Sequence, residues 1–406
     1  MGGRPDRLLA VWDAPRGPQT APVLRSSEGR GSPHLPILTT VQPPSSPPGT
    51  LVGELGPRFD DVARIAVLRG GGIGDLMFVL PAVESLAAAY PGAEITLLGM
   101  PSHAALLADR PAPFHAVEVL PVQPGVRPGP AADPAATEAF VARVRDLDLD
   151  LAVQAHGGGG NSNPFLLRLG ARHTVGTAAP DAPRLERNLP YRYFQHETQR
   201  WLEVAALAGA PAVQLEARLR GRGNTRPRPG TSPRLVVHPG ATDPRRRWPV
   251  ERFAEVAAAV AGRAVEVVVV GDASDRAAAE AIVAYAADPR VTSLADAIGL
   301  PALVDLLEDS DVVLANDSGP RHVAMAVGTA TVGVFWAPNM VNAAPVARRR
   351  HRAHPSWTNR CPRCGVPLAA DGELRCDHEE SWVAEVGVDA VLADVLELLA
   401  TPRTVA

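Results

Sequence analysis

The stretch RIAVLRGGGIGDLMFVLPAVESL, from Arg64 to Leu86, decides the fold class of this chain. Its residues 65–68 form a short apolar run that predicts a buried strand, and a glycine-rich turn follows. After the turn, apolar residues recur at the spacing of one helical face, at Leu76, Val79, Leu80, Val83 and Leu86. Pro81 stands early enough in this helix to be tolerated with a kink. The order of strand, turn and helix predicts an α/β fold.

Strands and helices continue to alternate along the chain, in two series. In the first series, residues 94–99 and 150–155 predict strands, and residues 198–210 predict a helix. The second series contains four apolar runs that predict strands, at residues 235–237, 265–270, 311–314 and 331–335. These runs are continuous rather than alternating in hydrophobicity, which is typical of parallel strands covered on both faces. The sequence therefore predicts two α/β halves.

Segments of different composition flank these halves. Residues 1–60 are rich in Pro, Gly, Ser and Arg and lack an apolar period, which predicts a disordered tail. Residues 218–233 are polar and proline-rich, which predicts a linker between an N-terminal domain, 62–217, and a C-terminal domain, 234–400. Residues 121–134 are also proline-rich and predict a surface loop.

The bulk composition is that of a globular protein, since 46% of the 406 residues are hydrophobic and 21% are charged. The formal net charge is -4, which gives no indication of nucleic-acid binding. The sequence has no lysine, and arginine clusters at residues 245–247 and 348–350, where such side chains can hold phosphates. No apolar run approaches the core of a signal peptide or the ~20 residues of a membrane span. We therefore expect a cytoplasmic protein, with peripheral contact at the inner face of a membrane left open.

Asp75 follows a glycine-rich turn, at residues 70–74, where the first strand passes into its helix. Backbone N–H groups gather at such a position for an anion, but the dinucleotide fingerprint G-x-G-x-x-G fails here in either frame. A carboxylate at this place is suited to accept a proton from a hydroxyl, which makes Asp75 a candidate general base. The alternative that Asp75 only caps the helix stays open.

Two loops of the second series follow strands and precede helices. Residues 238–242 (HPGAT) place small residues just before three arginines, which predicts either a diphosphate site or an ordinary loop with a solvated arginine run. Residues 316–322 (NDSGPRH) open a helix at the carboxyl end of a strand, where ligands bind in doubly wound folds. Asp317 is a candidate to orient a sugar hydroxyl or to cap the helix. His322 is a candidate donor ligand or a structural histidine.

The loop at residues 154–163 (QAHGGGGNSN) is polar and glycine-rich and follows a strand of the first half. Such a loop either faces the acceptor side of a cleft or is merely flexible. The acceptor-side candidates are Gly72, Gly74, Gln154, His156 and Asn161.

All three cysteines of the chain lie in one region, so a disulfide framework does not hold the fold. Cys361, Cys364, Cys376 and His378 are the residue types that bind tetrahedral zinc. Because only one residue separates Cys376 from His378, a structural zinc site and free thiols remain alternatives.

Taken together, the order of these segments resembles glycosyltransferase family 9, the heptosyltransferase family. Members of this family have the GT-B fold, in which two Rossmann-like, doubly wound domains face each other across a cleft, and the resemblance implies the same fold here. The likeness covers roughly residues 62–400. It rests on Arg64–Leu86, on HPGATDPRRRWP from His238 to Pro249, and on DVVLANDSGPRHVAMAVGTATVGVFW from Asp311 to Trp336.

The resemblance implies an inverting transfer of a sugar from a nucleotide-diphosphate donor, with ADP-heptose suggested by the family name, to a hydroxyl of a glycan or glycolipid acceptor in cell-envelope glycan synthesis. It implies that Asp75 is the catalytic base and that no metal is required. It assigns donor binding to Gly240, Ala241, Thr242, Arg246, Asp317, Ser318, Gly319 and His322. Arg246 stands where the family commonly has a lysine, which keeps the charge but changes its geometry. The acidic position after the next strand is Asp272 or Asp275.

Two other functions use the same segments. One is a different GT-B activity on nucleotide sugars, such as an epimerase, which would need no acceptor. The other is a nucleotide-binding scaffold without catalysis, in which replacement of Asp75 would change nothing measurable.

Overall fold

The computed structural model describes residues 52–219, 232–368 and 376–401, which belong to one compact unit, Pro48–Ala406. The predicted tail up to residue 51 and residues 220–231 of the predicted linker lie outside the described residues. Residues 52–60 were also assigned to the tail, but part of this segment is packed. Phe59 is buried and its N–H donates to the Tyr90 hydroxyl at 3.1 Å, so the packed region begins before residue 60.

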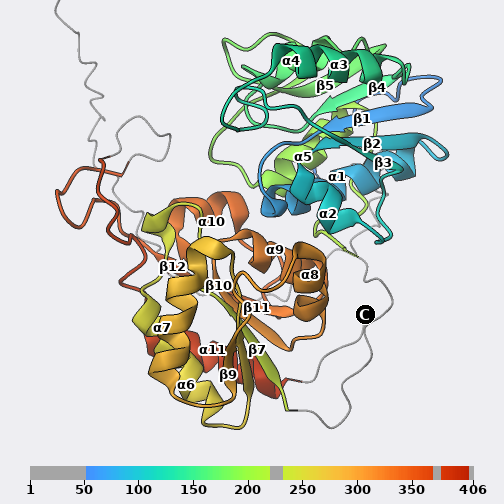
Figure 1. Ribbon diagram of the computed structural model, residues 1–406. Coiled ribbons are helices and arrows are strands. Elements are labelled where there is room, and N and C mark those ends of the chain that lie inside the picture. The colour runs from blue at the N-terminus through green and yellow to red at the C-terminus, as the bar shows by residue number, and fades with distance from the viewer. Residues whose placement is uncertain (1–51, 220–231, 369–375, 402–406) are drawn as a thin grey trace, which may run out of the picture. The chain divides into compact units, whose positions relative to one another are not determined.

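The first half folds into a six-stranded parallel sheet in the order β3-β2-β1-β4-β5-β6 (Figure 1). Its strands are β1 (Arg64–Leu68), β2 (Glu94–Gly99), β3 (Ala116–Val119), β4 (Leu151–Gln154), β5 (His173–Ala178) and β6 (Arg187–Pro190). Its helices are α1 (Ile73–Ala89), α2 (Pro101–Leu107), α3 (Pro134–Arg145), α4 (Ser162–Leu167) and α5 (Glu197–Leu207). Successive residues of β1 point to opposite faces, toward α1 and α5 on one side and toward α3 and α4 on the other.

The second half repeats this architecture with a parallel sheet of six strands in the order β12-β11-β10-β7-β8-β9. Its strands are β7 (Arg234–His238), β8 (Glu266–Val269), β9 (Val291–Ser293), β10 (Val312–Asn316), β11 (Ala330–Trp336) and β12 (His351–Ser356). Its helices are α6 (Val250–Ala261), α7 (Arg276–Ala286), α8 (Leu300–Glu308), α9 (Gly319–Ala326), α10 (Ala337–Ala343) and α11 (Val388–Ala400), with short 3₁₀ turns η1 (Pro244–Arg246) and η2 (Ala273–Asp275). The two doubly wound sheets confirm the predicted fold class, and the strands and helices read from the sequence are present with small shifts at their ends.

Helix α1 does not have the single apolar face that its sequence suggested. Val79 and Val83 pack on the sheet of the first half, whereas Leu76 and Leu80 join a second cluster with α9 residues such as Val323. This division could not be predicted from the apolar spacing alone, because a helix covered on two sides carries apolar residues around most of its circumference. The halves therefore share a hydrophobic cluster, in which α1 lies on α9 and α2 lies on α8.

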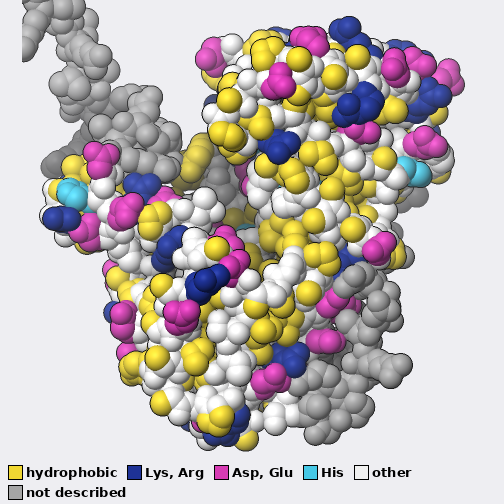
Figure 2. Space-filling view, viewed as in Figure 1, with side chains coloured by type: hydrophobic (Ala, Val, Ile, Leu, Met, Phe, Trp, Pro, Cys, Tyr) yellow, Lys and Arg dark blue, Asp and Glu magenta, His cyan; other side chains and the backbone are white. Residues whose placement is uncertain are grey.

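Charged side chains of both signs are intermixed on the face shown in Figure 2. Charged side chains also form close ion pairs, such as Arg143 with Glu118 at 3.0 Å and Arg352 with Glu397 at 2.9 Å. In the part of the chain that the structure describes, no helix has the length and hydrophobicity needed to cross a bilayer.

Candidate active site

The N-termini of α1 and α9 meet, and this contact unites the two most specific sequence motifs. Each helix follows the carboxyl end of a central strand, β1 or β10. A Cβ placed on Gly74 would lie 3.0 Å from Cδ2 of His322 and 3.3 Å from Cα of Gly319, so the backbones touch where no side chain intervenes. The positive ends of two helix dipoles thus lie close together, at the sheet edges where doubly wound folds bind ligands.

Asp75 lies in the first turn of α1 and uses its two oxygens differently. Oδ2 accepts the N–H of Gly72 at 2.7 Å, as expected of a helix-capping residue. Oδ1 accepts a hydrogen bond from Arg69 at 2.5 Å, while 43% of the side chain remains exposed to solvent. Both sequence alternatives are therefore compatible, because the carboxylate caps its helix and still reaches a solvent-accessible surface.

Arg69 is a site residue that the sequence analysis missed. Its side chain is 4% exposed, and it donates to the carbonyl of Ala155 at 2.7 Å as well as to Asp75. Its guanidinium also lies over the Trp201 ring, 5.0 Å from the centroid, and 3.6 Å from Glu197. A buried arginine requires such partners. The only sequence signal was a charged residue directly after a buried strand.

Gln154, the first residue of the glycine-rich loop of residues 154–163, is fully buried. Its amide nitrogen donates to the Ser162 hydroxyl at 2.5 Å and to the His156 carbonyl at 2.6 Å, and its amide oxygen accepts from the backbone and hydroxyl of Thr177. Because these bonds occupy its polar atoms, Gln154 holds the loop in shape from within the protein.

His156 and Asn161 lie above Gln154, against the proline-rich loop near Gly125. His156 Nε2 is 3.1 Å from the Gly125 carbonyl, and the exposed Asn161 side chain packs against the same glycine. Burial and the nearby Arg69 charge lower the pKa of His156. The Gly72 carbonyl lies 3.1 Å from Nε2 of the buried His103. Of the five acceptor-side candidates, Gly72 donates to Asp75, and His156 lies close enough to Arg69 and Asp75 to be affected by their charges. Asn161 contacts the same glycine as His156, whereas Gly74 faces α9.

The loop after β7 is held by Asn316, at the end of β10. The Asn316 side chain donates to the Pro239 and Gly240 carbonyls at 2.7 and 3.3 Å and accepts the Trp248 N–H at 2.9 Å. Asn316 thus ties the two predicted donor-side loops together, although the sequence analysis assigned it no role of its own. Ala241 in this loop is buried, whereas Thr242 is exposed.

Asp275, and not Asp272, is the acidic residue that faces this loop. Asp275 is 6% exposed, and its Oδ2 lies 3.6 Å from Nε2 of His238. A Cβ on Gly240 would lie 2.4 Å from the Asp275 carboxylate, so a larger residue there would displace this carboxylate. Burial would raise the pKa of Asp275, but His238, the Asp272 N–H and the Arg247 charge together hold it below its usual range. The sequence left both aspartates open, and of the two it is Asp275 that contacts Gly240 and His238.

Asp317 lies at the start of α9 and faces three basic side chains. Its oxygens lie 3.2 Å from Nε2 of His322, 3.4 Å from Arg321 and 3.4 Å from Arg246, and Asn339 donates to it at 3.0 Å. Burial would raise the pKa of Asp317, but His322 and the two arginines hold it well below its usual range. Asp317 is therefore an anion at neutral pH, and it orients Arg246, whose side chain is 24% exposed.

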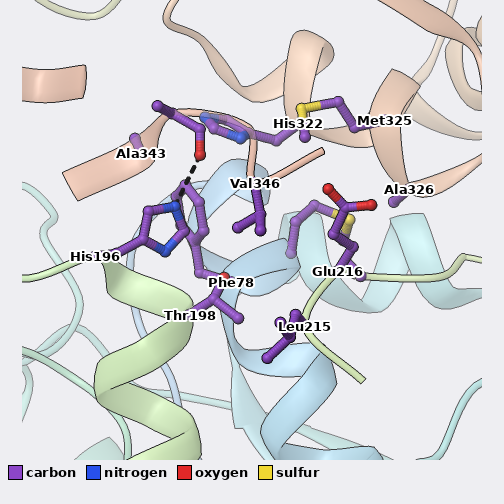
Figure 3. Close-up of a pocket in the computed structure, with 13 residues that line it drawn as sticks. Phe78, His196, Thr198, Leu215, Glu216, His322, Met325, Ala326, Ala343 and Val346 are labelled. Carbon is purple, nitrogen blue, oxygen red and sulfur yellow. Dashed lines mark hydrogen bonds between the residues drawn. The ribbon is translucent and has the colours of Figure 1, made fainter. Parts of the chain in front are cut away.

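His322 separates the Asp317 cluster from a pocket between the two halves. Burial and the Arg321 charge lower the pKa of His322 to about 4, so the ring is neutral at pH 7. Figure 3 shows His322, Met325 and Val346 from the second half opposite Phe78 and His196 from the first. His196 Nε2 donates a hydrogen bond across this boundary to the carbonyl of Ala344 at 2.8 Å, since a carbonyl oxygen only accepts. Ser318, at the cap of α9, contacts His238 Nδ1 at 3.0 Å.

The four candidate metal ligands come together in the second half. The ligand atoms of Cys361, Cys364, Cys376 and His378 all lie within 4.8 Å of one another. Thiolates bound to a tetrahedral zinc at about 2.3 Å are separated by a little under 4 Å, so a small closing movement would complete the site. Hydrogen bonds from the Cys364 and Arg363 backbone lower the pKa of Cys361 to about 6, which favours the thiolate that a metal binds. The residues present fit a Cys₃His metal centre.

A large part of the sequence, from β4 of the first half into the second half, also matches a family model. The model of glycosyltransferase family 9 (heptosyltransferase) matches residues 153–362, which is more than half of the chain. The chain belongs to glycosyltransferase family 9.

Known members of family 9 resemble this chain in sequence and in fold. Lipopolysaccharide heptosyltransferase 3 of Escherichia coli is 27% identical over 179 residues, which cover 42% of this chain and 48% of that protein. The match thus spans about half the length of that curated relative. Among solved structures, a family 9 glycosyl transferase from Veillonella parvula superposes with a TM-score of 0.66 and 16% identity over 85% of this chain and 99% of that chain. The E. coli ADP-heptose LPS heptosyltransferase II superposes with a TM-score of 0.63 and 18% identity over 83% and 98%. These two structures confirm the GT-B fold.

Proposed function

We propose that the protein is an inverting glycosyltransferase that transfers a sugar, with ADP-heptose as the first donor to test, to a hydroxyl of a glycan or glycolipid. The observation that carries the proposal is the contact between α1 and α9, which brings the solvent-accessible Asp75 next to the Asp317 cluster. Family membership supports the reaction class, and the names of two relatives support a heptose and a lipopolysaccharide acceptor.

The donor is proposed to bind to the second half. The nucleotide diphosphate would lie between the N-terminus of α9 and the loop of residues 240–242, where backbone N–H groups and Arg246 can bind its negative charge. Ser318, Gly319 and the neutral His322 would line the same place. Asp317 would not touch the phosphates, since two anions repel; it would hold Arg246 and His322 in position.

The acceptor is proposed to bind to the first half, at the rim formed by Gly72, His156 and Asn161 beside Asp75. The acceptor hydroxyl would give its proton to Asp75 while its oxygen forms a bond to the anomeric carbon on the face opposite the nucleotide. The bond from that carbon to the diphosphate oxygen breaks at the same time, and its electron pair leaves with the nucleoside diphosphate. The α9 dipole and Arg246 would stabilise the charge on this leaving group. The exposed side of Asp75 would then release the proton to solvent.

The transfer is tested by incubating the full-length protein with ADP-heptose and a panel of glycan and glycolipid acceptors while ADP release is measured. We expect release that depends on an acceptor. Asp75→Asn keeps the size of the side chain and removes the base, so we expect kcat to fall about 10²- to 10⁴-fold while the Kd for ADP stays within about twofold.

The same assay separates the alternatives. An epimerase would convert the nucleotide sugar to an isomer without any acceptor, and product analysis would detect that isomer. A scaffold would bind ADP but release none, and Asp75→Asn would have no effect. Either result would refute the proposed transfer.

We also propose that Cys361, Cys364, Cys376 and His378 bind a structural zinc. Four ligands close such a site and leave no open position, so the metal would have no part in the chemistry of transfer. Elemental analysis of the purified protein is expected to give about one equivalent of metal, and a Cys361→Ser/Cys364→Ser variant is expected to lose it. Metal content that is unchanged in this variant would rule out the site.

The proposed glycolipid acceptors suggest where the enzyme works. We propose a cytoplasmic protein that contacts the inner face of the membrane peripherally. Fractionation of cells that produce the full chain tests this proposal, since such a protein should be released from membranes by salt.

A further inference from the structure

The Cys₃His cluster adjoins the loop that the proposed function assigns to the donor diphosphate. Two strands of the second sheet end at this place, β11 at Trp336 and β12 at Ser356, and Cys361 follows β12 by a short segment. The metal-ligand candidate His378 is followed closely by Ser381 and Trp382, and these two residues contact the loop directly. The cluster thus lies on the donor side of the second half.

Three contacts join the segment after His378 to the loop of residues 243–248. The Trp382 N–H donates to the Arg245 carbonyl at 2.7 Å, and the Ser381 hydroxyl donates to the Arg247 carbonyl at 2.6 Å. The Arg245 guanidinium lies over the Trp382 ring, 4.4 Å from the centroid. These contacts hold the residues on both sides of Arg246, the arginine that reaches Asp317.

Trp382 is itself fixed from the other side. It is 2% exposed, and its ring centroid is 4.5 Å from that of Trp336. The Ser356 hydroxyl donates to its carbonyl at 2.5 Å. Trp382 therefore joins the ends of β11 and β12 to the loop of residues 243–248, and it follows the candidate ligand His378 by four residues.

Side-chain contacts join the ligand-bearing segments, residues 361–364 and 376–380. Arg363 pairs with Glu380 at 3.2 Å, and such an exposed pair contributes little. Between the candidate ligands themselves, Cys361 Sγ lies 3.8 Å from His378 Nδ1, which is a weak contact. A bound metal would replace it with four short bonds and fix Cys376 and His378 against the segment of residues 361–364. The Cys376 thiol and the Glu379 carboxylate also lie close enough to Arg245 to interact with its charge.

We infer that metal binding at Cys361, Cys364, Cys376 and His378 fixes the loop of residues 243–248, through Ser381 and Trp382, in the conformation that binds a nucleoside diphosphate. The inference rests on the proposed function for the ligand of that loop. Metal occupancy would therefore control donor affinity without any contact between metal and donor.

The experiment compares full-length protein as zinc-loaded, chelator-treated and zinc-reloaded samples. Hydrogen exchange measured by mass spectrometry is expected to rise in peptides that cover residues 243–248 and 381–383 when zinc is removed, because the Trp382 N–H bond to Arg245 loosens. Peptides of α1 serve as the internal reference and are expected to stay unchanged. Calorimetric titration with ADP is expected to give a Kd higher by on the order of tenfold in the zinc-free sample, since about two hydrogen bonds that support the loop are lost. Reloading should restore both values.

A variant that keeps all four ligands tests the connection itself. Ser381→Ala removes the bond to the Arg247 carbonyl, and we expect unchanged zinc content with ADP binding weakened about threefold to tenfold. Arg363→Gln is the matched control. Arg363 lies between two ligand cysteines but is 66% exposed and pairs only with Glu380 among the described residues, so exchange, zinc content and ADP binding should not change.

The outcomes separate this inference from the proposed function. If the zinc-loaded protein binds no nucleoside diphosphate, the proposed function fails, while the exchange data still test the connection between metal and loop. If ADP binds equally with and without zinc and the exchange of residues 243–248 does not change, the inference is overturned and the proposed function stands.

Discussion

Replacing Asp317 by asparagine keeps the shape of the side chain and removes the negative charge that contacts Arg321, Arg246 and His322. Arg321 is fully buried, so the variant would leave a guanidinium in the protein interior without an anion at 3.4 Å. The Asn339 amide, which donates to Asp317 at 3.0 Å, would also face a weaker acceptor.

The magnitude follows from these contacts. Breaking a buried ion pair by removing one partner costs about 3–5 kcal/mol, and we take the lower end, about 3 kcal/mol, because the arginine contacts are long. For a domain of this size, each kcal/mol lowers Tm by roughly 2–4 °C, so Asp317→Asn is expected to unfold about 6–12 °C below the wild type. The Kd for ADP is expected to rise on the order of tenfold, because Arg246 loses the anion that orients it.

The double variant Asp317→Asn/Arg321→Met is the control for stability. Methionine can keep the packing on Phe335, over which the Arg321 guanidinium lies at 4.5 Å, without a buried charge. We expect the double variant to recover part of the lost Tm but not the ADP affinity, since Arg246 still lacks its partner. Urea unfolding and calorimetry measure the two quantities separately. A loss of less than about 1 kcal/mol in Asp317→Asn, or equal losses in the single and double variants, would show that the Asp317–Arg321 pair does not stabilise the fold as a buried ion pair.

Three further predictions concern the contact between the halves and the buried polar groups. Gly74→Ala is expected to lower the transfer rate on the order of tenfold, because the added methyl would lie 3.0 Å from Cδ2 of His322; Gly299→Ala, which caps α8 and meets nothing closer than 3.9 Å, should keep the wild-type rate. Arg69→Met is expected to lower kcat on the order of a hundredfold with an unchanged Kd for ADP, because Asp75 loses the side chain that positions it. Arg69→Lys should restore part of the rate. A rate of Arg69→Met within twofold of the wild type would show that Arg69 does not position Asp75. The pKa of His322 in the folded protein is lowered from 6.5 to about 4. The free energy of unfolding is therefore expected to be largest above pH 6.5 and to fall by roughly 3 kcal/mol at most as the pH drops toward 4. Thermal unfolding at several pH values should show a smaller fall in His322→Gln, and parallel curves for the two proteins would contradict the lowered pKa of His322.

The sequence allowed the central strands of both sheets to be predicted, because β1, β7, β10 and β11 are short apolar runs next to glycine-rich or polar turns. It gave no prediction for β12, whose sequence HRAHPS contains two histidines, an arginine and a proline. That strand lies at the edge of its sheet, where fewer side chains have to be buried and proline is tolerated.

The candidate site could be predicted in part, because its motifs are local. Asp75 and the start of α9 were identified from the residues around them. The roles of Arg69 and Asn316 could not be, since each depends on partners far away in the chain, at Ala155 and at residues 239–248. The choice between Asp272 and Asp275 likewise required the distance to Gly240. Spacing also said little about the cysteine cluster, because tertiary contacts and not a regular motif bring its two segments together.

The most direct test of the account is a calorimetric titration of the wild-type protein with ADP, GDP and UDP. We expect that one of the three binds, that the corresponding nucleotide sugar competes with it, and that Arg246→Met weakens both. If none of the three binds, or if Arg246→Met leaves binding unchanged, the second half does not hold the donor as proposed.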